Sequence, residues 1–156
     1  MASLVATDKI ASRMKIEMFV HMPADGATEQ VVKAGTTTAT WKALRDYDAF
    51  AVLAVQAVKG GNGMVELSIY AAENASGGNA TEIKTTGVIA ADAIGDYAFL
   101  ECSAEEVAAI GEALGYNFTH IAAYIDSHHN DDEQGVVYIR HAANRQAAAL
   151  TATTIS

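Results

Sequence analysis

The chain has 156 residues, of which 51% are hydrophobic, and a formal net charge of −9. This length predicts one domain that buries enough surface to need no disulfide, and the single cysteine excludes an internal one. No run approaches the roughly 20 apolar residues of a membrane span, and Asp8, Lys9 and Arg13 interrupt any secretory signal, so we expect a protein made in the cytoplasm with no membrane partner.

The charge is unevenly distributed along the chain. Residues 1–45 hold six of the ten lysines and arginines against four acidic residues, and residues 46–156 hold the other four against fifteen. An acidic body repels polyanions, because sequence-independent nucleic-acid binding depends on Lys and Arg side chains next to phosphates. We therefore expect no direct binding of nucleic acid. A mildly basic segment on an acidic body instead suits docking on an acidic protein surface.

The first 14 residues are predicted to form an extended N-terminal arm, because they are small, weakly apolar and partly basic. A β-domain is expected over residues 15–141. Residues 142–156, rich in Ala and Thr, are predicted to form an extended C-terminal tail. We expect the arm to carry the partner interface, with these residues as candidates: Leu4, Val5, Lys9, Arg13 and Lys15.

A first strand is predicted from about residue 16 to Pro23, because apolar side chains recur there at every second position. Residues 31–32 and 36–44 also favour strands, since β-branched and aromatic side chains fit a pleated surface. Phe19 and Trp41 are expected in the core.

The middle of the chain predicts an antiparallel sheet. An apolar run over residues 50–58 and an alternating run over residues 64–70 flank the glycine-rich segment 60–63, which we interpret as the turn of a β-hairpin. A second turn-forming loop, residues 74–79, leads to a short strand over residues 81–88.

One short helix is predicted at about residues 103–115. Ser103 and Glu106 have the spacing of a capping box, in which each residue satisfies a backbone N–H of the other. Gly115 is placed to end the helix. A single apolar stripe is expected on its buried side, formed by Val107, Ile110 and Leu114.

Residues 118–125 and 136–140 are predicted to form a closing hairpin around a polar loop. This loop holds a cluster of residue types that bind metal ions. The candidate metal ligands are His128, His129 and Asp131. Their spacing matches no rigid metal site, so we expect a solvated loop with no metal and no other cofactor.

Signatures of catalysis are missing from the sequence. It contains no Gly-x-Ser-x-Gly elbow, no phosphate-binding loop and no CxxC pair. Cys102, in a strand-like run, is expected to be an ordinary buried thiol. We therefore expect no enzymatic activity. Several short strands with one helix predict a mainly β protein, an antiparallel β-sandwich or jelly-roll-like domain.

Parts of residues 46–140 resemble small structural proteins of tailed bacteriophages. The resemblance lies in Asp46-Tyr47, in Val65 to Asn74 closing on Gly77-Gly78, and in Glu101, Ala104-Glu105-Glu106-Val107 and Asn117 to Ile121. It implies a capsid cement (decoration) protein on the exterior of a virion assembled in the host cytoplasm. Such a protein bridges subunits of the major capsid protein and forms homo-oligomers.

Two alternatives stay open. The first is a neck, head-completion or tail component of the same kind of virion. The second is a carbohydrate-binding β-sandwich module, which would need exposed aromatic rings on one face; the candidates are Tyr70, Tyr124 and Tyr138.

Overall fold

A computed structural model describes residues 14–22, 29–34, 38–127 and 129–142. It confirms a mainly β fold with one short helix among these residues. The strands are β1 (Met14–His21), β2 (Gln30–Val31), β3 (Lys33–Ala34), β4 (Thr38–Ala39), β5 (Lys42–Ala43), β6 (Ala49–Val58), β7 (Glu66–Ala72), β8 (Thr81–Thr85), β9 (Tyr97–Ser103), β10 (His120–Asp126) and β11 (Glu133–His141), and the helix is α1 (Ala104–Leu114).

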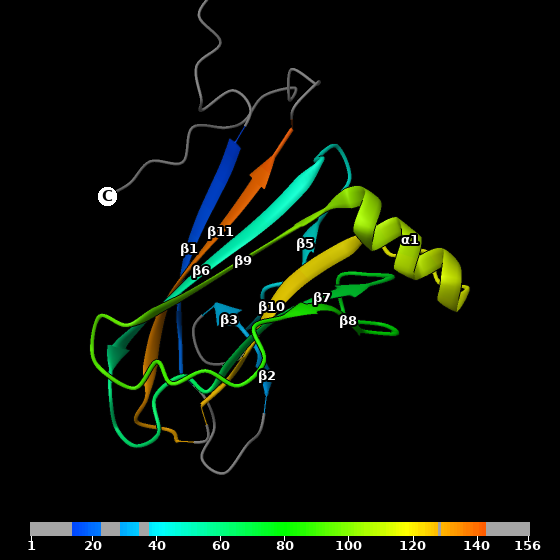
Figure 1. The fold of residues 1–156 in the computed structure, drawn as a ribbon. Coiled ribbons are helices and arrows are strands. Elements are labelled where there is room, and N and C mark those ends of the chain that lie inside the picture. Colours follow the sequence, from blue (N-terminus) through cyan, green and yellow to red (C-terminus); the bar gives the residue numbers. More distant parts are fainter. Residues whose placement is uncertain (1–13, 23–28, 35–37, 128, 143–156) are drawn as a thin grey trace, which may run out of the picture.

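The longer strands form two antiparallel sheets that face each other (Figure 1). The first sheet has the order β1-β11-β6-β9, and the second has the order β2-β10-β7-β8, with β5 also paired to β10. When β2 and β5 are taken as one strand position, the first sheet holds positions 1-8-3-6 of the chain and the second holds 2-7-4-5. This alternation between the sheets is the strand order of a jelly roll.

Two of the predicted hairpins are wrong. β6 and β7 lie in different sheets, and so do β10 and β11, so the loops after β6 and after β10 cross from one sheet to the other. A glycine-rich segment can form either a hairpin turn or a crossing between sheets. Here the backbone N–H groups of the loop after β6 donate hydrogen bonds to Asp132 in the loop after β10. The hairpin formed by β7 and β8 is present as the loop at residues 74–79 predicts.

The core fills the space between the two sheets. Its largest fully buried side chains include Phe50, Met64, Leu67 and Ile69. Trp41 is buried and Phe19 packs against the core, as expected from the sequence.

Tyr138 is fully buried, so its expected outward orientation is wrong. Its ring makes edge contacts with Phe19 and Phe50 at centroid distances of 5.0 Å. Its hydroxyl oxygen accepts a hydrogen bond from the backbone N–H of Ala123 at 2.7 Å and also bonds Thr40 Oγ1 at 2.8 Å. Buried tyrosines require such partners, and these two come from the opposite side of the sandwich.

The helix begins and ends where the sequence predicts. Ser103 accepts from the backbone N–H of Glu106 at 3.1 Å, and the Glu106 carboxylate accepts from the Ser103 N–H at 2.7 Å. Gly115 takes the left-handed conformation, with φ of 76°. The buried residues of the helix are Val107 and Gly111. Leu114, which the sequence places in the buried stripe, is instead 51% exposed.

Cys102 is the buried thiol that was expected. Burial raises its pKa to about 12, with a smaller contribution from the nearby Glu106 carboxylate. Within the described part of the chain, the helix is too short to cross a membrane.

Candidate interaction surface

The outer side of the first sheet is apolar across all four of its strands. The pairing registers place Met18 of β1 beside Val137 of β11, Val137 beside Leu53 of β6, and Leu53 beside Phe99 of β9. Because side chains alternate along a strand, these four residues point to the same side of the sheet. They form a continuous apolar row from one edge strand to the other.

Two neighbouring rows extend this surface. One row consists of Ile16, Ile139, Ala51 and Glu101, and the other consists of Val20, Gly135, Val55 and Tyr97. We call the apolar members of the three rows the outer apolar face: Ile16, Met18, Val20, Ala51, Leu53, Val55, Tyr97, Phe99, Gly135, Val137 and Ile139.

The outer apolar face is open to solvent. Met18 is 73% exposed and Tyr97 is 69% exposed, with Val20, Phe99 and Ile16 at 55%, 49% and 46%. The second sheet and α1 lie on the other side of the first sheet (Figure 1). Among the described residues, no helix or strand covers the face. Contiguous exposed apolar surface of this kind is typical of a site that binds another protein.

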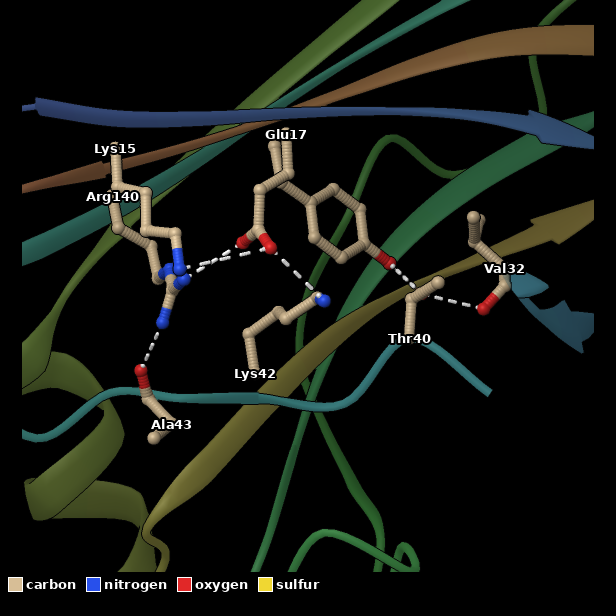
Figure 2. A network of polar contacts seen from close by, with 8 residues as sticks. Lys15, Glu17, Val32, Thr40, Lys42, Ala43 and Arg140 are labelled. Carbon is tan, nitrogen blue, oxygen red and sulfur yellow. Dashed lines mark hydrogen bonds and ion pairs between the residues drawn. The ribbon is translucent and has the colours of Figure 1, made fainter. Parts of the chain in front are cut away.

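Polar side chains occupy the opposite, inward side of β1 and β11. Figure 2 shows Glu17 of β1 between two cations: Arg140 Nη2 lies 2.7 Å from one carboxylate oxygen, and Lys42 Nζ lies 3.1 Å from the other. Arg140 Nη1 also donates to the backbone carbonyl of Ala43 at 2.8 Å. The network therefore ties β1 and β11 of the first sheet to β5 of the second.

The ionisation of Glu17 follows from these contacts. Burial alone would raise the pKa of its carboxyl, but the hydrogen bond from Lys42 and the charges of Arg140 and Lys42 outweigh burial and hold that pKa below its usual value. Glu17 is thus a carboxylate at neutral pH. On the inward side, this charged network lies beside the apolar core, whereas the outward side is apolar and, among the described residues, uncovered.

The predicted interface residues are not brought together by the described part of the chain. Lys15 lies in β1, where its ammonium is 3.9 Å from the Glu17 carboxylate. Leu4, Val5, Lys9 and Arg13 lie outside the described residues, as do residues 143–156 of the predicted tail. The outer apolar face itself was missed, although the alternation of apolar residues along β1 was its signal.

The loop with the metal-ligand residue types makes hydrogen bonds to the glycine-rich loop after β6. Asp132 is fully buried, and its carboxylate accepts hydrogen bonds from the backbone N–H groups of Gly60, Gly61 and Gly63 at 2.8, 3.1 and 3.1 Å. His129 Nδ1 lies 4.0 Å from the exposed Asp131 carboxylate.

His128 lies outside the described residues. Within the described ranges, no group of three or more His, Cys, Asp or Glu side chains is arranged to hold a metal ion.

The aromatic candidates for sugar binding are mostly covered. Tyr70 and Tyr124 stack on each other with a centroid distance of 4.1 Å, and Trp41 and Tyr124 make an edge contact with a centroid distance of 6.1 Å. The Tyr70 hydroxyl donates to Glu29 at 2.8 Å, and burial raises the pKa of that carboxyl. These rings pack against each other in a small second core, so they do not present a flat exposed platform.

A groove of about 480 Å³ lies beside α1. Its lining is mainly apolar and includes Leu44, Val107 and Phe118, together with Arg45 and His120. Among the described residues of its walls, none carries a buried polar side-chain atom without a hydrogen-bond partner, so we assign the groove no ligand.

Comparison with models of protein families gives no match, and comparison with curated proteins gives none either. Among solved structures, the chain is similar to a Bacillus protein from the structure described as "Bacillus endospore appendages form a novel family of disulfide-linked pili". The identity is 16% over 83% of this chain and 88% of that chain, with a TM-score of 0.36. A likeness at this score carries no conclusion about fold or function.

Proposed function

We propose that this chain is a non-enzymatic structural protein that works by assembling with other proteins, and that its place is the capsid of a tailed-bacteriophage virion. The observation that supports an assembly role is the outer apolar face. A sheet that exposes Met, Ile, Val, Leu and Phe side chains on the side away from its own core gains stability when another protein covers them.

The dimensions of the face suit a protein interface. Four strands about 4.8 Å apart and five residues rising about 3.3 Å each give roughly 320 Å² in projection. A standard interface buries about 800 Å² on each partner, with an apolar core and a polar rim. The outer apolar face fits within such an interface as its apolar core.

Within assembly proteins, we propose a capsid cement protein that lies on the capsid exterior and bridges subunits of the major capsid protein. The resemblance to structural proteins of tailed bacteriophages supports this role, and so does the acidic body, which suits an outward-facing surface. Jelly rolls occur in viral capsid proteins and also in lectins, so the fold adds support only by analogy. The packed Tyr70 and Tyr124 rings offer little to a sugar, and we do not favour the carbohydrate-binding alternative.

The copy number of the chain in purified virions tests the proposal. Gel densitometry against the major capsid protein should give one copy per capsid subunit or a simple fraction of it. A ratio of a few per cent would place the chain in the neck or tail instead. Absence from virions would overturn the virion role altogether.

A variant links the outer apolar face to incorporation. Met18→Glu places a charge on the face at a 73% exposed position, where the fold itself is not expected to suffer. It should be lost from virions, whereas Leu114→Glu, at a 51% exposed position on α1, should be retained. Equal incorporation of both variants would show that the face has no part in assembly.

A further inference from the structure

We propose that the partner that covers the outer apolar face is a second copy of this chain, packed sheet against sheet. This inference rests on the proposed assembly role and names the partner at the same surface. The first argument is availability. An uncovered apolar sheet face is an aggregation hazard from the moment of folding, and a second copy is present as soon as the protein is made.

The second argument is charge. Two chains that each carry a net charge of −9 repel each other unless they meet where carboxylates are scarce. In the three rows of the outer face, as far as the chain is described, the one charged side chain is Glu101. It lies on the edge strand β9 and reaches solvent. The face is therefore a place where two acidic copies can come into contact.

The third argument is shape. A twofold axis that runs parallel to the strands between β11 and β6 places β11 of one copy over β6 of the other, and β1 over β9. Gly135 then lies over Val55 of the second copy, and Ala51 lies over its Ile139. Each small residue meets a larger one, as close packing requires. Because the axis is twofold, every such contact occurs twice.

The same arrangement separates the charges and joins the largest side chains. Met18 of each copy lies over Phe99 of the other, a sulfur–aromatic contact. The two Glu101 carboxylates lie above opposite edges of the interface, about 14 Å apart at three strand spacings, which exceeds the screening length of about 8 Å at physiological salt. Face-to-face sheets of this kind pack about 10 Å apart with their strands roughly aligned.

Sedimentation of the purified full-length chain over a concentration series is the first test. The wild-type chain should be a dimer, and Met18→Glu should raise its dissociation constant at least about 100-fold, because the change enters a symmetric interface twice. Leu114→Glu should leave the dimer unchanged. A wild-type chain that is monomeric at about 100 μM overturns the inference, including the case in which residues 1–13 or 143–156 cover the face. A dimer that Met18→Glu does not weaken overturns it as well.

Cysteine cross-linking tests the arrangement. Met18 and Phe99 lie on β1 and β9, three strand spacings or about 14 Å apart within one copy, so the double variant Met18→Cys/Phe99→Cys cannot close a disulfide inside one chain. Because the facing sheets would lie about 10 Å apart, a thiol-reactive cross-linker that spans about 8 Å, rather than direct oxidation, should link the double variant into covalent dimers and leave each single variant unlinked. The native thiol of Cys102 is buried and does not interfere. Linkage of the Met18→Cys variant with itself would overturn the proposed axis.

The two proposals fail separately. A stable dimer in solution that is absent from virions would overturn the virion role and leave the dimer standing. A chain present in virions at high copy number but monomeric when purified would overturn the dimer and leave the virion role standing.

Discussion

The carboxylate of Asp132 lies 2.8 Å from the backbone nitrogen of Gly60, although 72 positions separate the two residues. This contact joins the two loops that cross between the sheets at one end of the sandwich. The glycine-rich segment after β6 turns its amides toward a buried carboxylate of the same protein. A group of convergent backbone N–H donors of this kind can bind a free anion. Here the Asp132 carboxylate of the same chain occupies that position.

Removing this carboxylate should destabilise the protein. We expect Asp132→Ala to lower the free energy of unfolding by about 3 kcal/mol, because it leaves buried N–H groups without an acceptor. Asp132→Asn keeps one acceptor oxygen and should cost about half as much. Urea denaturation measures both. The control is Asp131→Ala, whose side chain is 75% exposed and which should stay within about 0.5 kcal/mol of wild type.

His21 should make the protein sensitive to mild acid. It is fully buried beside its register partner Gln134, and neither ring nitrogen has a hydrogen-bond partner within the described ranges. Burial, with a smaller contribution from the charge of Lys33, lowers its pKa to about 4. The unfolded chain takes up this proton at about 6.5, so stability should be complete above that pH and fall as the pH drops from 6.5 toward 4.

His21→Leu tests this directly. The variant should flatten the fall in stability between pH 6.5 and 4, which we expect to amount to about 2–3 kcal/mol for this one group. Urea denaturation at several pH values provides the measurement. Parallel curves for wild type and variant would show that His21 does not contribute to the acid sensitivity.

The pair formed by Arg140 and Glu17 should also be needed for stability. Arg140→Met leaves the Glu17 carboxylate with Lys42 as its main cation, and we expect a loss of about 2–3 kcal/mol at pH 7. Adding Glu17→Gln should recover part of that loss, since no carboxylate then remains uncompensated. Arg45→Met, at a side chain that is 88% exposed, should have little effect.

The same pair predicts a second pH effect. Because the pKa of Glu17 is lowered in the folded chain, its stabilisation is present above the ordinary value of 4.5 and is lost as the pH falls through the lower folded value. The Arg140→Met variant should lose less stability than wild type in this acidic range. A steeper loss in the variant would contradict the assignment.

Gly111 should not tolerate alanine. In most helices Gly→Ala raises stability by about 1 kcal/mol. Here a Cβ atom at residue 111 would lie 2.7 Å from the backbone oxygen of Tyr116 and 3.1 Å from the Phe118 ring, so the change should lower stability by about 1–2 kcal/mol. Thermal unfolding checks the sign. The matched variant Ala109→Gly, on the exposed side of α1, should also lower stability, by about 1 kcal/mol.

Sequence patterns predicted the structure correctly where the interactions that form it lie between neighbouring residues. The capping box at Ser103 and the strand β7 depend on residues within a few positions of each other, and both are confirmed, although burial along β7 does not alternate, since Ser68 is buried together with Leu67 and Ile69. The two wrong hairpins depend on Asp132, which is distant in sequence from the glycines that it binds. No pattern within a glycine-rich segment tells a hairpin turn from a crossing between sheets.

The outer apolar face was missed for a different reason. Alternation divides the residues of β1 and β11 into two sides, but both sides contain large apolar residues. The side with Phe19 and Tyr138 is the buried one. It also holds Glu17 and Arg140, which can be buried there because their opposite charges pair with each other. The more uniformly apolar side remains open, and a sequence of one chain cannot show that its best hydrophobic surface lies outside its own core.

The pairing of Met14 with His141 also determines how the domain would respond to a pulling force. The described domain begins and ends on neighbouring antiparallel strands, at the same end of the sheet. Tension applied through both ends of the chain would open the ladder between β1 and β11 one hydrogen bond at a time. Tension spread across the outer side of the sheet would instead be shared by four strands, so the direction of loading decides how firmly this domain resists it.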